Sequence, residues 1–305
     1  MEFLVGTHFN FLGHRRAAFI VSVVLILAGA ISLIAHGGPK LGIDLDEDGG
    51  ILIQIRFEQA IEAQQIRDSI EGIGMGGGEI QHFGGDREAI IRMAVVDGME
   101  DQAGEIINAL NRDHPENRAE MRRQELVGPK VGKELQAKAT QAIIIALVLI
   151  LAYISIRFEF KFAAGAVAAL AHDVAITFGM FSLTGREISL PVIAAFLTIV
   201  GYSLNDTIVI YDRIRENRRK LYGKSFVDIV NTSLNESLSR TIVTSLTTLL
   251  VVLCLFIFGG EVIKDFAFAL LIGVIVGTYS SIYVASPLVV EWQIHAEARR
   301  RGRHK

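Results

Sequence analysis

The chain has 305 residues, of which 51% are hydrophobic and 21% are charged, and its formal net charge is -3. Its apolar residues gather in runs longer than a soluble core requires, which excludes an ordinary water-soluble protein and a disordered chain. The near-neutral charge gives no overall basic field, so no nucleic-acid partner is expected. The single cysteine, Cys254, excludes an intrachain disulfide.

The first apolar run, Ala17–Ala35, is long enough to cross a bilayer. Arg15 and Arg16 precede it, as they would in a signal peptide. The run exceeds the usual length of a signal-peptide core, and no small-residue cleavage site follows it. We therefore predict an uncleaved first membrane helix over 17–35, after a cytoplasmic N-terminus over 1–16.

Residues 36–139 are polar enough to form a separate small domain. Alternating or helically spaced apolar residues predict its elements in the order strand, helix, strand, strand, helix, strand: Ile51–Phe57, Ala63–Ile70, Glu79–Phe83, Ala89–Met93, Ala103–Leu110 and Ala119–Leu126. Asp97 and Glu100 have the spacing of a capping box before the second helix. This order favours an α+β ferredoxin-like sandwich.

Three short motifs match ligand sites only in part. Gly72–Gly77 fits a dinucleotide-binding pattern, but it follows a helix instead of a strand. Gly223–Ser225 resembles the end of a P-loop without the required upstream glycine. Asp44–Gly49 matches the first half of a calcium loop, but Ile55 stands where a bidentate glutamate belongs. The first predicts a flexible turn, the second predicts no nucleotide site, and whether the acidic loop binds a cation stays open.

Five more apolar runs complete a six-helix membrane bundle. They lie within 140–290, at 142–156, 162–183, 188–211, 241–258 and 266–290. Val131–Thr140 is expected to form a helix that runs directly into the second span. Most lysines and arginines of the short flanks fall on one side of these spans, and only Arg186 and Lys264 fall on the other. The positive-inside rule then places both termini in the cytoplasm, including a basic tail over 291–305, and the 36–139 domain outside.

Ionisable residues inside the membrane point to function, because each costs about 2.5–3.5 kcal/mol on insertion scales. Asp173 lies near the middle of the third span beside His172, and Asp206 lies in the fourth beside Asn205. Arg240 opens the fifth span. No motif supplies the ligands or paired carboxylates of an intramembrane protease, so neither enzymatic activity nor a metal or other cofactor is expected.

Asp206 and Arg240 are expected at similar depth on neighbouring spans. One interpretation is a structural ion pair. The other is a proton relay, since a carboxylate in an apolar setting binds a proton more readily and a nearby arginine favours its ionised form. Asp173 could act in series, or could serve only in helix packing. The residues expected to support the relay are His172, Asn205, Thr244 and Thr248, and a stripe of small residues that includes Gly273 and Gly277 predicts close packing of the sixth span.

Four segments together resemble the SecF family of the RND superfamily: Val127–Leu135 (VGPKVGKEL), Ala171–Thr177 (AHDVAIT), Val200–Asn217 (VGYSLNDTIVIYDRIREN) and Ser233–Thr241 (SLNESLSRT). The resemblance covers nearly the whole chain in order. It departs at Gly42–Gly50, which is two residues longer and more acidic than the family pattern.

The resemblance implies a fold of six membrane helices with an extracytoplasmic domain after the first. It also implies an accessory subunit of the Sec translocase in the bacterial inner membrane, which with SecD uses the proton motive force for late, ATP-independent steps of protein export. The implied partners are SecD, the SecYEG channel, YajC, the translocating polypeptide and protons, within the lipid bilayer. Asp206 and Arg240 match family positions tied to proton movement. The alternatives are a proton-coupled exporter of small molecules or lipids and a passive scaffold for SecD.

Overall fold

The computed structural model describes residues 8–42, 50–75, 78–82, 85–96 and 101–303. The chain divides into two compact units. One comprises Leu41–Gln141, and the other combines Met1–Lys40 with Ala142–Lys305. The acidic loop Asp44–Gly49 and the proposed cap residues Asp97 and Glu100 lie outside the described residues.

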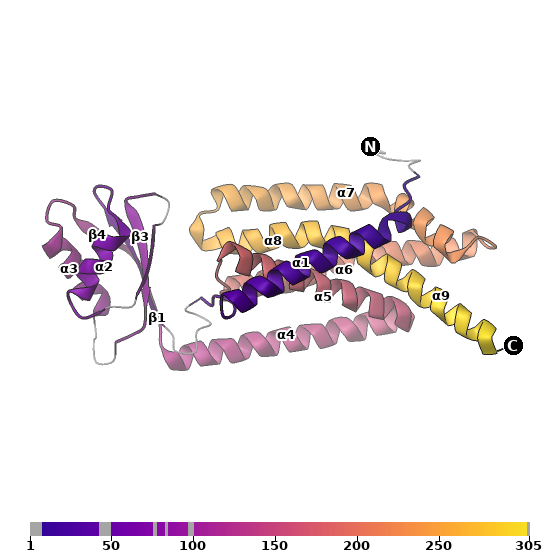
Figure 1. Cartoon of the computed structure of the whole chain (residues 1–305), viewed down its shortest axis with the longest axis horizontal. Coiled ribbons are helices and arrows are strands. Elements are labelled where there is room, and N and C mark those ends of the chain that lie inside the picture. Colours follow the sequence, from indigo (N-terminus) through magenta and orange to yellow (C-terminus); the bar gives the residue numbers. More distant parts are fainter. Residues whose placement is uncertain (1–7, 43–49, 76–77, 83–84, 97–100, 304–305) are drawn as a thin grey trace. The chain divides into compact units, whose positions relative to one another are not determined.

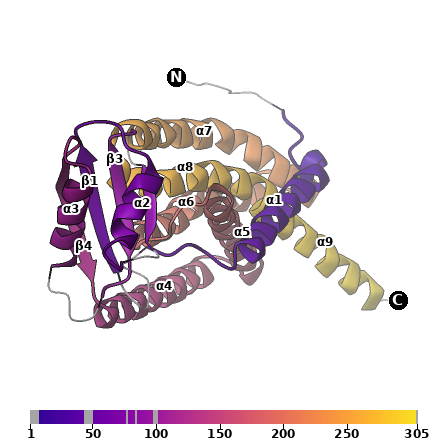
Figure 2. The same cartoon turned by 60° about the vertical axis from the view of Figure 1, so that its left-hand side comes forward.

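The smaller unit is the predicted α+β sandwich. Its elements are β1 Gly50–Phe57, α2 Ala63–Glu71, β2 Glu79–His82, β3 Glu88–Met93, α3 Gln102–Asp113 and β4 Ala119–Val127. The strands pair in the order β2-β3-β1-β4, and every pairing is antiparallel. Figure 2 shows this sheet with α2 and α3 beside it. This order is that of a ferredoxin-like fold, which confirms the prediction.

Period-two alternation explains the core of this unit. Ile51, Ile53 and Ile55 of β1 are at most 1% exposed, because every second residue points to the helix-covered face. Ile106 and Leu110 of α3 are fully buried against them. The N-cap of α3 is Asp101, whose Oδ1 accepts from the Gly104 amide at 2.9 Å.

The second unit contains the membrane helices, one of which begins before Ala142, in the smaller unit. They are α1 Arg15–Ala35, α4 Pro129–Arg157, α5 Phe160–Thr184, α6 Leu190–Lys220, α7 Phe226–Phe258, α8 Glu261–Ser280 and α9 Ser286–Arg303, with a short helix Leu12–His14 before α1 and a π-helical turn Ser281–Ala285 between α8 and α9. Six stretches of the described chain are long and apolar enough to span a bilayer, which confirms the six predicted spans. As expected, α4 begins well before its apolar run. Figure 1 shows α7 and α4 at opposite sides of this unit.

The π-helical turn has a local cause in Pro287. Proline has no amide hydrogen and its ring clashes with the carbonyl four residues earlier, so a regular α-helix cannot continue through it. The helix widens at Ser281–Ala285, and the Ser286 hydroxyl donates to the Ser281 carbonyl at 2.9 Å. Such turns often lie at functional sites, and this one lies beside the polar interior described below.

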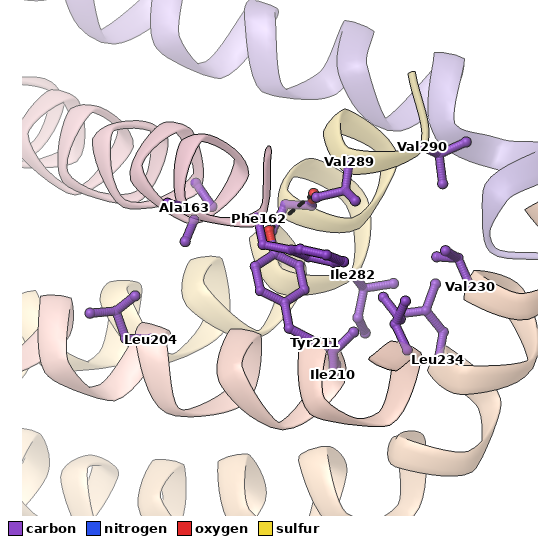
Figure 3. Packing of buried hydrophobic residues seen from close by; sticks show 14 of the residues in the cluster. Phe162, Ala163, Leu204, Ile210, Tyr211, Val230, Leu234, Ile282, Val289 and Val290 are labelled. Carbon is purple, nitrogen blue, oxygen red and sulfur yellow. Dashed lines mark hydrogen bonds between the residues drawn. The ribbon is translucent and has the colours of Figure 1, made fainter. Parts of the chain in front are cut away.

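Tyr211 anchors the apolar core of the bundle. It is 1% exposed, its hydroxyl donates to the Ala285 carbonyl at 3.3 Å, and its ring meets the Phe162 ring edge-on at 4.8 Å between centroids. Figure 3 shows this ring between α5, α6 and the helix after the π-turn, with Ile282 and Val289 packed around it.

Small residues set the close approaches of the helices. Gly273 of α8 faces the Ile199 side chain of α6, and a Cβ on Gly277 would lie 3.0 Å from Cβ of Ser203. The two predicted packing glycines therefore do face a neighbouring helix. A closer crossing joins α1 to α5, where a Cβ on Gly29 would lie 2.6 Å from the Cα of Gly179.

This crossing gives a stability prediction. Gly179→Ala places a methyl group against backbone that cannot move aside, and we expect it to destabilise the helical unit by about 1–3 kcal/mol. Gly201→Ala is the matched control, because a Cβ there meets nothing within 4 Å. Unfolding of the purified chain in detergent by denaturant measures both variants. Equal stability of the two would contradict the assigned α1–α5 crossing.

Candidate functional site

Asp206 is a buried carboxylate with little support from hydrogen bonds. It lies on α6 and is 4% exposed. The Ser245 hydroxyl of α7 donates to its Oδ2 across 3.4 Å, and the same hydroxyl oxygen lies 2.7 Å from Thr278 Oγ1 of α8. Thr278 already donates to the Val274 carbonyl at 2.8 Å. Ser245 thus shares a single proton between two acceptors, and Asp206 receives at most one weak hydrogen bond.

No ion pair joins Asp206 to Arg240 within the described part of the chain. Arg240 lies on the neighbouring helix α7 and is exposed. The structural ion pair that the sequence left open is therefore not formed in this conformation. A buried carboxylate without a bound cation is costly when ionised, so this arrangement favours its protonated form.

Other polar groups line the same interior. Thr207 of α6 and Ser281 of the π-turn approach each other at 2.8 Å between their hydroxyl oxygens. The oxygens of Tyr202, Ser237 and Thr241 are buried without a hydrogen-bond partner among the described residues. Ser237, Thr241 and Ser245 recur every four residues on α7 and face the bundle together. These hydroxyls make a polar lining where α6, α7 and α8 meet.

Asp173 belongs to a second, fully bonded cluster. Asp173 is 0% exposed, and its side chain receives contacts from α5, α6 and α8. His172 Nδ1 lies 3.0 Å from its Oδ1, while the Ser203 and Ser280 hydroxyls donate to its Oδ2 at 2.6 and 2.8 Å. Three groups around one carboxylate give it a fixed geometry.

The histidine continues this cluster to α1. His172 Nε2 lies 2.9 Å from the Ser22 hydroxyl, which lies 3.1 Å from the Tyr279 hydroxyl. Tyr279 donates in turn to the Ala18 carbonyl at 2.6 Å. The His172 and Tyr279 rings also stack, with 6.0 Å between their centroids. A continuous hydrogen-bonded chain therefore links Asp173 to the backbone of α1.

The other predicted support residues do not reach the carboxylates in this structure. Asn205 is exposed. Thr244 and Thr248 donate back to carbonyls of their own helix, at 2.9 and 3.0 Å. Sequence reasoning singled out the two aspartates and His172, but it did not assign their hydrogen-bond partners, which are Ser22, Ser203, Ser245 and Ser280. It also missed Tyr279, which stacks on His172, and Thr278, which contacts Ser245.

Basic residues gather where α4 meets α5 and α6 ends. Arg157 donates to Asp212 at 2.9 Å, and Arg218 donates to Glu159 at 3.2 Å. A hydrogen bond from Lys161 lowers the pKa of Glu159, which lies between two helices. The N-terminal segment reaches α7, since the Phe9 amide donates to Asn235 Oδ1 at 2.8 Å. No group of three or more potential metal-binding side chains occurs in the described ranges.

Comparison with known proteins gives consistent matches. The family model described as "Protein export membrane protein SecD/SecF, C-terminal" matches residues 106–295. Protein translocase subunit SecF of Desulfurispirillum indicum is 48% identical over 289 residues, covering 93% of this chain and 91% of that protein. The subunit of the same name from Rhodothermus marinus is 44% identical over 307 residues, covering 99% and 98%.

Solved structures agree with these matches. The crystal structure of SecDF from Thermus thermophilus superimposes with a TM-score of 0.86 at 40% identity, covering 96% of this chain and 40% of that one. A crystal structure of SecDF in a super-membrane-facing form gives a TM-score of 0.74 at 40% identity, covering 99% and 41%. This chain thus spans about two fifths of the length of the SecDF chains.

Proposed function

The chain belongs to the SecF family of protein translocase subunits, and from this premise we propose that it couples protein export to the transmembrane proton gradient. In this proposal a SecD partner completes the helix bundle, and the two subunits act together on late, ATP-independent steps of export. The observation that carries the proposal is the unpaired, buried carboxylate of Asp206.

Asp206 can exchange a proton because its surroundings stabilise neither form strongly. With one shared hydroxyl and no bound cation, the ionised form lacks compensation. Arg240 lies on the adjacent helix and would supply that compensation if α6 and α7 moved closer. An approach of Arg240 would release the proton, and its withdrawal would allow another to bind.

The polar lining offers a route to this carboxylate. The unpartnered hydroxyls of Ser237 and Thr241 lie two turns and one turn before Ser245, respectively, on the same face of α7. Hydroxyls at this spacing can pass a proton through intervening water. Asp173 and His172 would act in series with Asp206, across the α6–α8 contact.

The distribution of charge supports an orientation. One end of the helical unit is basic, and it combines the basic ends of α4, α5 and α6 with the N-terminal segment and α9. Arg15 contacts Glu291 of α9 at 3.1 Å there, and Arg157 contacts Asp212 of α6. By the positive-inside rule this end faces the cytoplasm. The α+β unit then lies on the outer side, where it can meet an emerging polypeptide. SecYEG and YajC are further partners in this proposal.

Inverted membrane vesicles depleted of the native subunit test the proposal. The chain is restored together with SecD, and release of an exported protein is followed after ATP is removed, with and without a proton gradient. We expect the restored vesicles to release more protein when the gradient is present. Equal release with and without the gradient would support a passive scaffold instead.

A further inference from the structure

The hydrogen-bonded chain between α1 and α5 has fixed directions. The Tyr279 hydroxyl lies 2.6 Å from the Ala18 carbonyl, and a carbonyl oxygen only accepts, so the Tyr279 proton points to Ala18. The contact of 3.1 Å between Tyr279 and Ser22 then requires a proton from Ser22. Ser22 has one hydroxyl proton, and it is now used toward Tyr279.

This fixes the histidine at the next contact. His172 Nε2 lies 2.9 Å from the Ser22 oxygen, which has no proton left to give in that direction. A hydrogen bond at this distance therefore requires that Nε2 carry the proton and donate it to Ser22. The tautomer of His172 is thus set by Ser22 and Tyr279, which act as positioning residues.

The last contact adds a second proton. Nδ1 of His172 lies 3.0 Å from Asp173 Oδ1, and two bare lone pairs cannot form a hydrogen bond. Asp173 Oδ2 already accepts from Ser203 and Ser280, so the extra proton belongs between Nδ1 and Oδ1. We propose that the His172–Asp173 pair is a second proton-binding site that holds two protons and carries no net charge in this conformation.

The burial of the His172–Asp173 pair agrees with a total of two protons and no net charge. Asp173 is 0% and His172 is 7% exposed. The groups that face the pair are Ser22 of α1, Ser203 of α6, and Tyr279 and Ser280 of α8, and no lysine or arginine contacts it within the described ranges. A neutral histidine beside an ionised aspartate would leave an uncompensated charge in an apolar bundle. The two-proton state removes that charge.

Loss of one proton has a structural consequence. Once Nε2 is bare, Ser22 must turn its hydroxyl toward His172, which breaks the hydrogen bond between Ser22 and Tyr279. That bond joins α1 to α8. The proton content of the pair is therefore linked to the α1–α8 contact, and this link contributes to transport only insofar as the proposed proton coupling holds.

Magnetic resonance of labelled histidine tests the proton on Nε2, without which the pair cannot hold two protons in this geometry. The full-length chain, with its histidines labelled in ¹³C and ¹⁵N, is studied in lipid bilayers, and the His172 signals are identified by their loss in His172→Gln. We expect a protonated Nε2 in the wild type. In Tyr279→Phe, Ser22 is free to donate to the ring, so the one-proton state is less disfavoured. We expect a bare Nε2 in a larger share of molecules than in the wild type at the same pH.

An unprotonated Nε2 in the wild type would overturn the inference, and that spectrum decides the question even if Tyr279→Phe does not fold. The same share of protonated Nε2 in well-folded Tyr279→Phe as in the wild type would remove the positioning role of Tyr279. The spectra are recorded without a gradient. If vesicles show gradient-dependent release but Nε2 is bare, this inference alone is contradicted. If Nε2 is protonated but release does not depend on the gradient, only the proposed function is contradicted.

Discussion

Asp206→Asn is expected to reduce gradient-dependent protein release to the level of vesicles that lack the chain. The carboxamide keeps the size of the side chain and its contact with Ser245, but it neither binds nor releases a proton. The variant should still insert and assemble, because a neutral group in this position removes a buried charge. Release of an exported protein after ATP removal measures the effect, at matched membrane levels of each variant.

Asp212→Asn is the matched control. It lies six residues further along α6, is partly exposed and pairs with Arg157 at 2.9 Å, where an ion pair contributes about 0–1 kcal/mol. We expect it to retain gradient-dependent release. If Asp206→Asn also retains full release, Asp206 is a packing residue and the proton path lies elsewhere.

Asp173→Leu and Asp173→Asn should differ strongly in stability. Leucine leaves the Ser203 hydroxyl and His172 Nδ1 without the partner that they share, and each buried unsatisfied group costs about 1–3 kcal/mol. The Ser280 hydroxyl also loses Asp173 but keeps the Gly277 carbonyl at 3.1 Å as an acceptor. We expect Asp173→Leu to lower the free energy of unfolding by about 3 kcal/mol or more, because more than one buried group loses its partner.

Asparagine preserves the pattern of the cluster. Its carboxamide oxygen accepts from both serines, and its amide donates to Nδ1 of a histidine protonated on Nε2. We therefore expect a loss of about 1 kcal/mol or less, a typical net value for one hydrogen bond. Denaturant unfolding of the purified chain in detergent compares the two variants. Comparable losses for leucine and asparagine would contradict the assigned hydrogen bonds of the Asp173 cluster.

The sequence predicted the fold well because its signals are local. Period-two alternation from Ile51 to Phe57 and long apolar runs depend only on neighbouring residues and on the thickness of the bilayer. Helix ends were predicted less well. The helix of the fourth predicted span, α6, continues to Lys220, and the helix of the fifth, α7, begins at Phe226. Hydropathy marks only the part of a helix that lies in lipid, and polar residues extend both helices beyond that part.

Only the charged residues of the site could be predicted from the sequence. Asp173, Asp206 and Arg240 stand out because charge inside an apolar run is expensive. Serine and tyrosine carry no such signal, since both are ordinary in membrane helices. Ser22 and Tyr279 are separated by 257 positions, and only the packing of α1 against α5 and α8 brings them to His172. The π-turn was missed for a different reason: Pro287 is visible in the sequence, but its effect depends on the helix continuing beyond it.

Infrared difference spectroscopy of the full chain in lipid bilayers tests most directly whether Asp206 binds a proton. A protonated carboxyl group gives a carbonyl stretching band that the carboxylate lacks. We predict a band that appears on acidification, is lost in Asp206→Asn and remains in Asp173→Asn. A spectrum in which wild type and Asp206→Asn show the same carboxyl bands, over the range in which both stay folded, would contradict a proton-exchanging Asp206.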